Sequence, residues 1–314
     1  MRFISERESA RLVTPKMAFD AARDALIAAA SDGVVCPVVL CTDPKRGNRI
    51  SVKAGMAGGV TGVKLGSFWP NNLAVGLPRH SSVILLVDAA TGRVDTVIEA
   101  SQANALRTAA ANAVAAGELA RRDARSLAVF GAGNQAFFDV CALAAVRKIR
   151  DVMVVGRAPG SAHALIERLA GVGIVAVAAG AQEACSAADM IVTVTPSREP
   201  LFDAAWVQPG TYIAAMGADG PGKQELPLAL LARASLFCDL PEQSVKLGEF
   251  QSIAAEVASG DFVLTAIGSV LLGLHPGRVT DQDVTIFDSS GLALQDIVLG
   301  LHITDGQSLA LAEI

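Results

Sequence analysis

With 314 residues, the chain is long enough for two domains with sizeable hydrophobic cores. Hydrophobic residues make up 52% of it, yet no run of 18 or more residues is free of polar groups, so we expect no membrane-spanning segment. The net charge of -5 and the absence of a basic run argue against a nucleic-acid partner.

The first third predicts one helix and then several short strands. The stretch 14–33, TPKMAFDAARDALIAAASDG, has Thr14 as N-cap, Pro15 at the first helical position and Gly33 as C-cap. Valine- and isoleucine-rich segments follow, separated by turn sequences such as DPKRGN and DAATGR. They predict an antiparallel or mixed sheet.

An alanine-rich helix is expected over 101–120, and after it the pattern changes. Strand and helix patterns alternate with short turns from SLAVFGAGNQAFF onward. This alternation indicates an α/β domain with a doubly wound parallel sheet, over residues 121–288. The last stretch, 289–314, predicts a helix or two that pack back on the first domain, 1–120.

The turn after the first strand of the second domain is the clearest motif. Gly131, Gly133 and Ala136 form a GxGxxA pattern between a strand and a helix. Such glycines let the backbone approach a pyrophosphate at the helix N-terminus, so we expect a dinucleotide here. The next strand ends in Gly156 and Arg157 without an acid. A guanidinium there favours the 2′-phosphate of NADP(H); NAD(H) stays possible, as does a solvated surface arginine.

Lysine is scarce, with seven residues against nineteen arginines, and two lysines lie in apolar strands. Lys53 and Lys64 are either edge lysines whose ammonium groups reach water or ligands for an anion. Arg107 lies in an almost uncharged helix, as a cap, an interface partner or a third cation of the same site. Together they would suit a substrate with one or two carboxylates. Asp219, in the stretch ADGPGK, fits a turn as well as proton transfer.

The five cysteines show no CxxC spacing, and the four histidines show no metal-ligand spacing. We therefore expect no metal. The charged N-terminal segment lacks the apolar core of a secretion signal. These features favour a protein of the reducing cytoplasm.

Three segments carry a resemblance that extends over nearly the whole chain. NALRTAAANAVAAGELARRDARSLAVFGAGNQA, AAMGADGPGKQEL and TIFDSSGLALQD resemble the ornithine cyclodeaminase/mu-crystallin family. The family includes ornithine and lysine cyclodeaminases, ketimine reductases, an alanine dehydrogenase, opine-type synthases and an iminosuccinate reductase. The resemblance implies a Rossmann domain plus a dimerisation and substrate domain built from both chain ends, with the active site in the cleft between them. It also implies a homodimer.

The resemblance also implies roles for individual residues. Lys64 and Arg107 would bind the substrate carboxylate, with Arg107 also contacting the cofactor. Asp219 and Lys64 would be the catalytic residues, with Asp219 as the acid/base, and Lys223 beside Asp219 would contact the cofactor. Asn134, Gln135 and Thr195 would contact the cofactor, with Thr195 on the nicotinamide side. Ser289 and Ser290 would belong to a segment that closes over the nicotinamide and substrate, with Ser289 contacting the cofactor and Ser290 the substrate.

The chain departs from the family pattern in its early strands. CPVVLCT lacks the arginine that many members use as a further carboxylate ligand, and Lys53 stands where cyclodeaminases tend to have an apolar residue. We therefore expect an NAD(P)H-dependent reductase of a small imino acid, of the ketimine or iminosuccinate type. The alternatives are an ornithine cyclodeaminase, which forms proline and ammonia, and a non-catalytic protein that binds NADPH or a small ligand.

Overall fold

The computed structural model describes residues 1–158 and 160–305, which form two compact units. Unit 1 comprises Met1–Arg107 and the chain from Leu292 onward, and unit 2 comprises Thr108–Gly291. The border therefore falls inside helix α3 (Ser101–Leu119), upstream of the boundary at 120 expected from the sequence. The predicted C-terminal helical segment is one helix, α11 (Ala293–Asp305), and its expected continuation over 306–314 lies outside the described residues.

Unit 1 contains a seven-stranded sheet in the order β1-β7-β6-β5-β4-β2, with β3 also paired to β4. Its strands are β1 (Arg2–Ile4), β2 (Val34–Val35), β3 (Val39–Thr42), β4 (Arg49–Ala57), β5 (Val60–Phe68), β6 (His80–Val87) and β7 (Val94–Glu99). The 3-10 helix η1 (Pro70–Val75) lies between β5 and β6. The sheet is mixed, because β1 pairs with β7 in parallel and the other described pairs are antiparallel.

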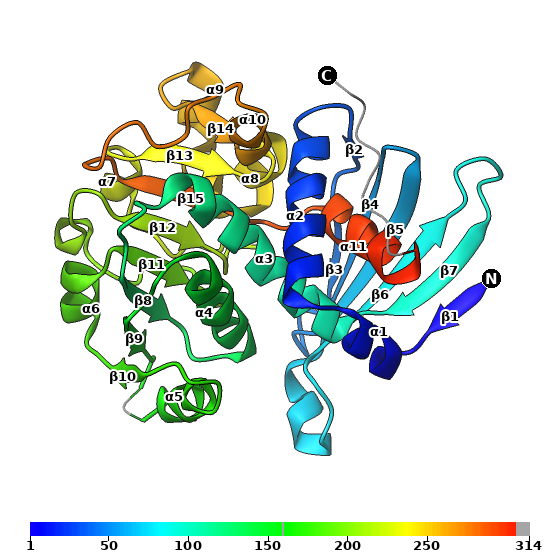
Figure 1. Ribbon diagram of the computed structural model, residues 1–314, viewed down its shortest axis with the longest axis horizontal. Coiled ribbons are helices and arrows are strands. Elements are labelled where there is room, and N and C mark those ends of the chain that lie inside the picture. The colour runs from blue at the N-terminus through cyan, green and yellow to red at the C-terminus, as the bar shows by residue number, and fades with distance from the viewer. Residues whose placement is uncertain (159, 306–314) are drawn as a thin grey trace. The chain divides into compact units, whose positions relative to one another are not determined.

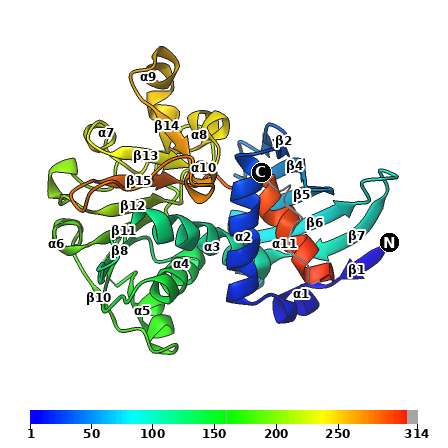
Figure 2. The same cartoon turned by 45° about the horizontal axis from the view of Figure 1, so that its top comes forward.

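One face of this sheet is covered by helices. Helix α11 lies along β4, β5 and β6 and beside α2 (Pro15–Ala29), while the short helix α1 (Glu6–Leu12) contacts β7 (Figures 1 and 2). Ile84 and Ile98, paired across β6 and β7, are almost fully buried on this face. Gly300 lets α11 approach closely, since an added Cβ would lie 3.3 Å from Ile84. The chain end is thereby anchored to the N-terminal sheet by apolar burial.

The opposite face of the sheet carries exposed apolar side chains. Val39, Ile50, Met56 and Leu65 are 63%, 37%, 49% and 42% exposed. The register Val39↔Val52↔Leu65 and the two-residue period of a strand put them on the same side, away from Lys64. An apolar surface of this kind is typical of an interaction site.

Helix α2 begins as the sequence indicates, and Thr14 accepts a hydrogen bond from the Met17 amide (3.1 Å). The expected end of this helix at Gly33 is wrong. The helix stops at Ala29, and the C-cap residue Ala30 has right-handed helical backbone angles. Gly33 instead donates its amide to the Ala28 carbonyl at 2.8 Å. An added Cβ there would lie 2.6 Å from that carbonyl oxygen. Glycine is therefore required by close packing.

Unit 2 contains an eight-stranded sheet, in the order β10-β9-β8-β11-β12-β15-β13-β14, whose described pairs are all parallel. Its strands are β8 (Ser126–Phe130), β9 (Asp151–Val155), β10 (Ala176–Ala178), β11 (Met190–Thr193), β12 (Tyr212–Ala215), β13 (Ser235–Cys238), β14 (Leu264–Ala266) and β15 (Thr285–Asp288). Its helices after α3 are α4 (Asn134–Val146), α5 (His163–Ala170), α6 (Ala181–Ala187), η2 (Ala204–Trp206), α7 (Leu228–Leu231), α8 (Pro241–Leu247), η3 (Glu249–Ile253), α9 (Ala254–Ser259) and α10 (Ile267–Leu271). The strand order changes direction at β8, where ligands bind in such sheets.

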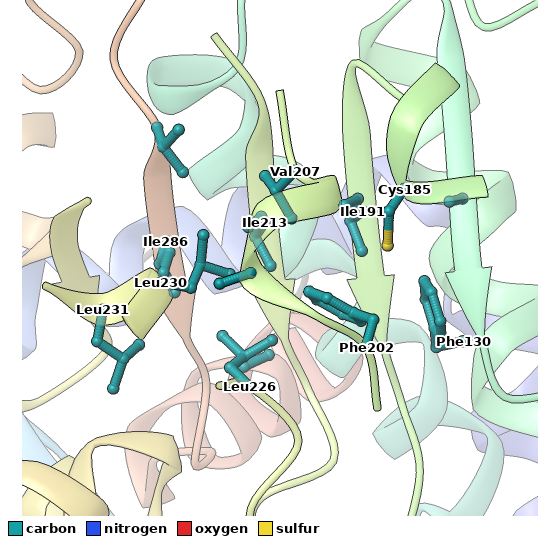
Figure 3. Close-up of a cluster of buried hydrophobic side chains, with 14 of the residues drawn as sticks. Phe130, Cys185, Ile191, Phe202, Val207, Ile213, Leu226, Leu230, Leu231 and Ile286 are labelled. Carbon is teal, nitrogen blue, oxygen red and sulfur yellow. The ribbon is translucent and has the colours of Figure 1, made fainter. Parts of the chain in front are cut away.

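A large apolar cluster packs one side of this sheet. Figure 3 shows Ile191, Ile213 and Ile286 from three adjacent strands beside Phe130 and Phe202. The two phenyl rings lie 5.0 Å apart, centroid to centroid. These strands are short and almost wholly buried, as expected for a parallel sheet covered on both faces. Because the strands are parallel, their carboxyl ends share one edge.

Candidate functional site

The glycine turn lies at that edge, between β8 and α4. Gly131 has a φ of 115°, and an added Cβ would lie 2.7 Å from the Val194 carbonyl oxygen. Gly133 precedes the first residue of α4, and a Cβ there would meet nothing within 4 Å. Ala136 is fully buried where the helix packs on the sheet. The backbone therefore turns tightly and leaves open space at the helix N-terminus, where a pyrophosphate fits.

The first residues of α4 are tied to neighbouring side chains. Arg168 donates to Asn134 Oδ1 at 2.8 Å, and its guanidinium lies 3.7 Å from the centre of the Phe137 ring. Gln135 donates to Asp139 at 3.2 Å. Burial raises the pKa of Asp139 to about 6, against the hydrogen bonds that it accepts. Arg168 thus adds a positive charge near the phosphate turn that the sequence did not point to.

Arg157 follows β9 and is exposed. Gly156 before it is crowded, since an added Cβ would lie 2.1 Å from Ser161 Oγ. No acidic residue takes the place of Arg157 at the end of this strand. The position is open to a ribose or its phosphate, which agrees with the sequence-based hypothesis without choosing between NADP(H) and NAD(H).

Unit 1 holds a buried group of charges, which we call the cation cluster: Lys64, Arg107 and Asp296, together with the amides Asn104 and Gln295. Lys64 on β5 and Arg107 on α3 are only 6% and 5% exposed. Both donate to Asn104 Oδ1, at 2.5 and 2.7 Å, and both pair with Asp296 Oδ1, at 3.4 and 3.0 Å. Arg107 also donates to Gln295 Oε1 at 3.0 Å.

A third cation acts on this cluster. Lys53 stands directly opposite Lys64 on β4, and its charge acts on both Lys64 and Asp296. Burial lowers the pKa of Lys64 to about 7, with Asp296 opposing and Arg107 and Lys53 assisting. Burial disfavours ionisation of Asp296, but the charges of Arg107, Lys64 and Lys53 outweigh it and lower its pKa. A ligand with one or two carboxylates would bring further negative charge to these cations.

Two buried polar atoms of the cluster have no hydrogen-bond partner among residues 1–158 and 160–305. They are Asp296 Oδ2 and Gln295 Nε2. A buried polar group without a partner is costly, and Nε2 is a donor suited to an anionic ligand. Asn104, Gln295 and Asp296 were not predicted from the sequence, although Gln295 and Asp296 end the segment TIFDSSGLALQD that carries the family resemblance.

Asp219 lies in the loop after β12, beyond the end of the strand. Its Oδ1 pairs with Lys223 Nζ at 2.5 Å, and Lys223 also donates to the Gly217 carbonyl at 3.0 Å. The Asp219 side chain is 40% exposed. The turn conformation and a role in proton transfer are therefore compatible, because the loop leaves the Asp219 carboxylate partly exposed while Lys223 pairs with it.

Gln251 holds this loop from η3. Its Oε1 accepts the Gly222 amide at 2.7 Å, and its Nε2 donates to the Gly220 and Lys223 carbonyls at 3.2 and 3.1 Å. Nothing in the local sequence signals this role, because Gln251 lies 32 residues from Asp219. The loop around Asp219 is consequently positioned by tertiary contacts.

Thr195 follows β11 and is bound by a residue that the sequence analysis did not single out. Glu225 Oε1 accepts both the Thr195 amide and its hydroxyl at 2.7 Å. Burial raises the pKa of Glu225, and the hydrogen bonds from Thr195 and Thr193 oppose that rise. Its neighbour Glu249 accepts the Glu225 and Leu226 amides, and burial raises the pKa of Glu249 to about 8.

Ser289 and Ser290 follow β15 and are buried around another acid. Ser290 Oγ donates to Asp239 at 3.1 Å and accepts from Gln243 at 2.8 Å. Ser289 Oγ lies 3.4 Å from the same carboxylate. The segment that was expected to close over the nicotinamide is thus held in place by Asp239, which the sequence did not point to.

Among residues 1–158 and 160–305, no group of three or more histidine, cysteine, aspartate or glutamate side chains could hold a metal ion. Over the same residues, no helix is both long enough and apolar enough to cross a membrane. The described chemistry is therefore that of a dinucleotide turn, a buried cation cluster and a loop carboxylate.

The eight-stranded parallel sheet, with its glycine turn at the strand-order change, defines a Rossmann-type fold. A model of the ornithine cyclodeaminase/mu-crystallin family matches residues 8–308. The iminosuccinate reductase of Paracoccus denitrificans is 37% identical over 309 residues, which are 97% of this chain and 96% of that protein. The chain belongs to the ornithine cyclodeaminase/mu-crystallin family.

Solved structures agree over nearly the full length. The Paracoccus denitrificans iminosuccinate reductase in complex with NAD+ has a TM-score of 0.89 at 36% identity, covering 97% of this chain and 95% of that one. An archaeal alanine dehydrogenase dimer with bound NAD has a TM-score of 0.90 at 33% identity, with coverages of 96% and 94%. The Thermococcus litoralis Delta(1)-pyrroline-2-carboxylate reductase with NADH and L-proline has a TM-score of 0.89 at 26% identity, and 96% of each chain is covered.

Proposed function

We propose that the protein reduces the C=N bond of a small imino acid, using a nicotinamide dinucleotide as hydride donor. The observation that carries this proposal is the cation cluster, in which buried Lys64 and Arg107 share a single carboxylate. The glycine turn supplies the place for the dinucleotide. Relatives named as iminosuccinate reductase and Delta(1)-pyrroline-2-carboxylate reductase support the same reaction class.

In this proposal carboxylate binding and proton exchange are carried out by different residues. Lys64 and Arg107 bind the substrate carboxylate, with Lys53 adding positive charge. A protonated imine carries a positive charge on nitrogen, which the Asp219 carboxylate stabilises. The hydride adds to the imine carbon, the C=N π electrons become the nitrogen lone pair, and the product is an amino acid. Asp219 also serves as the group through which the nitrogen exchanges protons.

The cation cluster favours an imino acid with two carboxylates. Lys64 and Arg107 share the single carboxylate of Asp296, the charge of Lys53 acts on the same group, and Gln295 Nε2 is a donor with no partner among the described residues. These cations would attract both carboxylates of an iminosuccinate-type substrate, whereas the terminal ammonium of ornithine would meet repulsion.

We propose a nicotinamide dinucleotide as the cofactor, with a preference for NADP(H) over NAD(H). Arg157 supports this preference, because a guanidinium forms charge-assisted hydrogen bonds with a 2′-phosphate. NAD(H) is the alternative, and it is the form named with the three solved relatives.

We also propose that the chain forms a homodimer through the exposed apolar face of the unit 1 sheet. A monomer by light scattering at micromolar concentration would contradict this.

The proposed reaction is tested by a cofactor-consumption screen. The substrates are oxaloacetate plus ammonia, pyruvate plus ammonia, pyrroline-2-carboxylate and piperideine-2-carboxylate, with NADPH and NADH in parallel. We expect oxidation of the cofactor in proportion to imino acid, fastest with the dicarboxylate. Asp219→Asn should keep dinucleotide binding and lower turnover by roughly 10²–10⁴, the scale of a lost general acid–base group. Ammonia released from ornithine without net cofactor change would establish a cyclodeaminase instead.

A further inference from the structure

We propose that Glu225 is a positioning residue that sets the relative placement of Thr195 and the Asp219 loop. Its carboxylate accepts four hydrogen bonds from two chain segments that leave adjacent strands. Thr193 and Thr195 lie at the end of β11, and Gly217 lies just beyond β12. This inference rests on the proposed function, in which Asp219 serves the imine nitrogen and the dinucleotide binds at the carboxyl ends of the strands, where Thr195 lies.

The carboxylate takes over where main-chain pairing between β11 and β12 stops. The last main-chain bond described between these segments runs from the Met216 amide to the Thr193 carbonyl at 2.8 Å. Val194 donates its amide to the Phe130 carbonyl of β8, and beyond it the two segments are joined through Glu225. Thr195 donates its amide to Oε1 at 2.7 Å, and Gly217 donates its amide to Oε2 at 2.9 Å. A side chain thus replaces the sheet ladder at the ligand-binding edge.

The threonine hydroxyls complete the set. Thr195 Oγ1 donates to Oε1 at 2.7 Å, and Thr193 Oγ1 donates to Oε2 at 2.8 Å. Each carboxylate oxygen therefore accepts one hydroxyl and one main-chain amide. Glu225 itself is fully buried, and its own amide is bound by Glu249 at 3.0 Å. Such a group is held on every side and can fix the segments that it binds.

Gly217 connects this carboxylate to Asp219. The Gly217 amide donates to Glu225, while its carbonyl accepts from Lys223, the residue that pairs with Asp219. The two segments also touch directly at this point, because an added Cβ on Gly217 would lie 2.2 Å from the Thr195 carbonyl oxygen. Any displacement of Gly217 consequently shifts the Asp219 loop relative to Thr195.

Glu225→Gln is the sharpest perturbation. Its amide nitrogen must replace either Oε1, facing the Thr195 amide, or Oε2, facing the Gly217 amide. A hydroxyl can rotate to accept, but a main-chain N–H cannot. One of the two segments must therefore move away. A 1 Å misplacement can lower turnover by about 100-fold, so we expect a loss of that order in kcat with little change in dinucleotide affinity.

A matched control exists at the opposite edge of the same sheet. Asp189 precedes β11 and accepts the Arg125 and Ser126 amides at 2.8 and 3.0 Å, together with Arg121 at 2.6 Å. Asp189→Asn disturbs a comparable bracing carboxylate far along the strand from the glycine turn. It should reduce thermal stability and leave kcat unchanged.

Three measurements test the proposal on full-length wild type, Glu225→Gln, Asp189→Asn and Gly217→Ala. They are steady-state kinetics, the isotope effect with cofactor deuterated at the transferred position, and amide hydrogen exchange. We expect Glu225→Gln and Gly217→Ala to lower kcat, to raise the isotope effect as hydride transfer becomes slower, and to expose the 216–219 amides. Gly217→Ala keeps the test open if Glu225→Gln does not fold.

The outcomes separate this inference from the proposed function. A wild-type protein that reduces no imino acid would contradict the proposed function. Amide hydrogen exchange would still test whether Glu225 holds the Thr195 and Gly217 segments together. Unchanged exchange at 195 and 217 in Glu225→Gln would overturn the inference. It would equally be overturned if Glu225→Gln and Asp189→Asn lost similar stability and both kept the wild-type kcat.

Discussion

Replacing Lys64 with methionine tests whether the cation cluster stabilises the folded protein or is an unfavourable arrangement that serves ligand binding. Methionine has a similar length and no charge, so the change removes the ammonium group and little volume. Burial lowers the pKa of Lys64 from its ordinary 10.5 to about 7. At about 1.4 kcal/mol for each tenfold change in proton affinity, the buried charge costs the fold about 5 kcal/mol near pH 7.

The substitution also removes a favourable contact, which offsets part of that gain. The pKa of about 7 already includes the pairing of Lys64 with Asp296, so the further loss is the hydrogen bond from the ammonium group to Asn104, about 3 kcal/mol. Asp296 keeps Arg107 as its partner at 3.0 Å. Lys64→Met should therefore stabilise the protein by about 2 kcal/mol at pH 7, within the range found for buried ion pairs replaced by apolar residues.

The effect of Lys64→Met should depend on pH. Between pH 7 and 10.5 the unfolded chain holds a proton on Lys64 that the folded chain does not, so wild-type stability rises with pH across this window. The advantage of Lys64→Met should be full below about pH 7 and shrink as the pH approaches 10.5. Urea denaturation of ligand-free protein at pH 6.5, 8 and 9.5 measures it.

Lys16→Met is the matched control for this series. Lys16 lies on α2 of the same unit, with its side chain 84% exposed, and it pairs with Asp20 on the surface. Its replacement should change the free energy of unfolding by less than about 0.5 kcal/mol at every pH. If Lys64→Met were less stable than wild type at pH 7, or if its effect did not vary with pH, the cluster would be a structural ion pair and our reasoning would be wrong.

Three further predictions concern binding and charge. Because Lys64 binds an anion only when protonated, KM for the imino acid should rise as the pH increases above about 7, and initial rates from pH 6 to 9 would show no such rise if Lys64 does not bind substrate. Burial raises the pKa of Glu249 to about 8, so wild-type stability falls as the pH rises from 4.5 to 8. Glu249→Gln should become more stable relative to wild type over that window, and a pH-independent difference in melting temperature would refute this prediction. Arg157→Ala should weaken NADPH binding by on the order of 1.5–3 kcal/mol and leave NADH nearly unchanged in titrations by cofactor fluorescence, and equal losses for both would refute the preference.

Local sequence was sufficient where a feature depends on neighbouring residues. The GxGxxA turn and the start of α2 at Thr14 depend on backbone freedom and capping within a few positions. The alternation of strand and helix patterns with short turns likewise predicted the parallel sheet of unit 2. The prediction of Gly33 as a C-cap was wrong. A glycine after a helix is typical of a C-cap, whereas here the glycine allows close packing against Leu294, far away in the chain.

Tertiary structure alone decided which charges meet. Lys64 and Arg107 stood out in the sequence as cations in apolar segments, but their common partner, Asp296, lies 189 residues beyond Arg107 on a helix that docks onto the sheet. Glu225 and Glu249 resemble ordinary surface acids in the sequence, and only the folded chain buries them among main-chain amides. A sequence pattern records what each residue prefers nearby, whereas the pKa of a buried charge depends on desolvation and on partners that folding brings from distant segments.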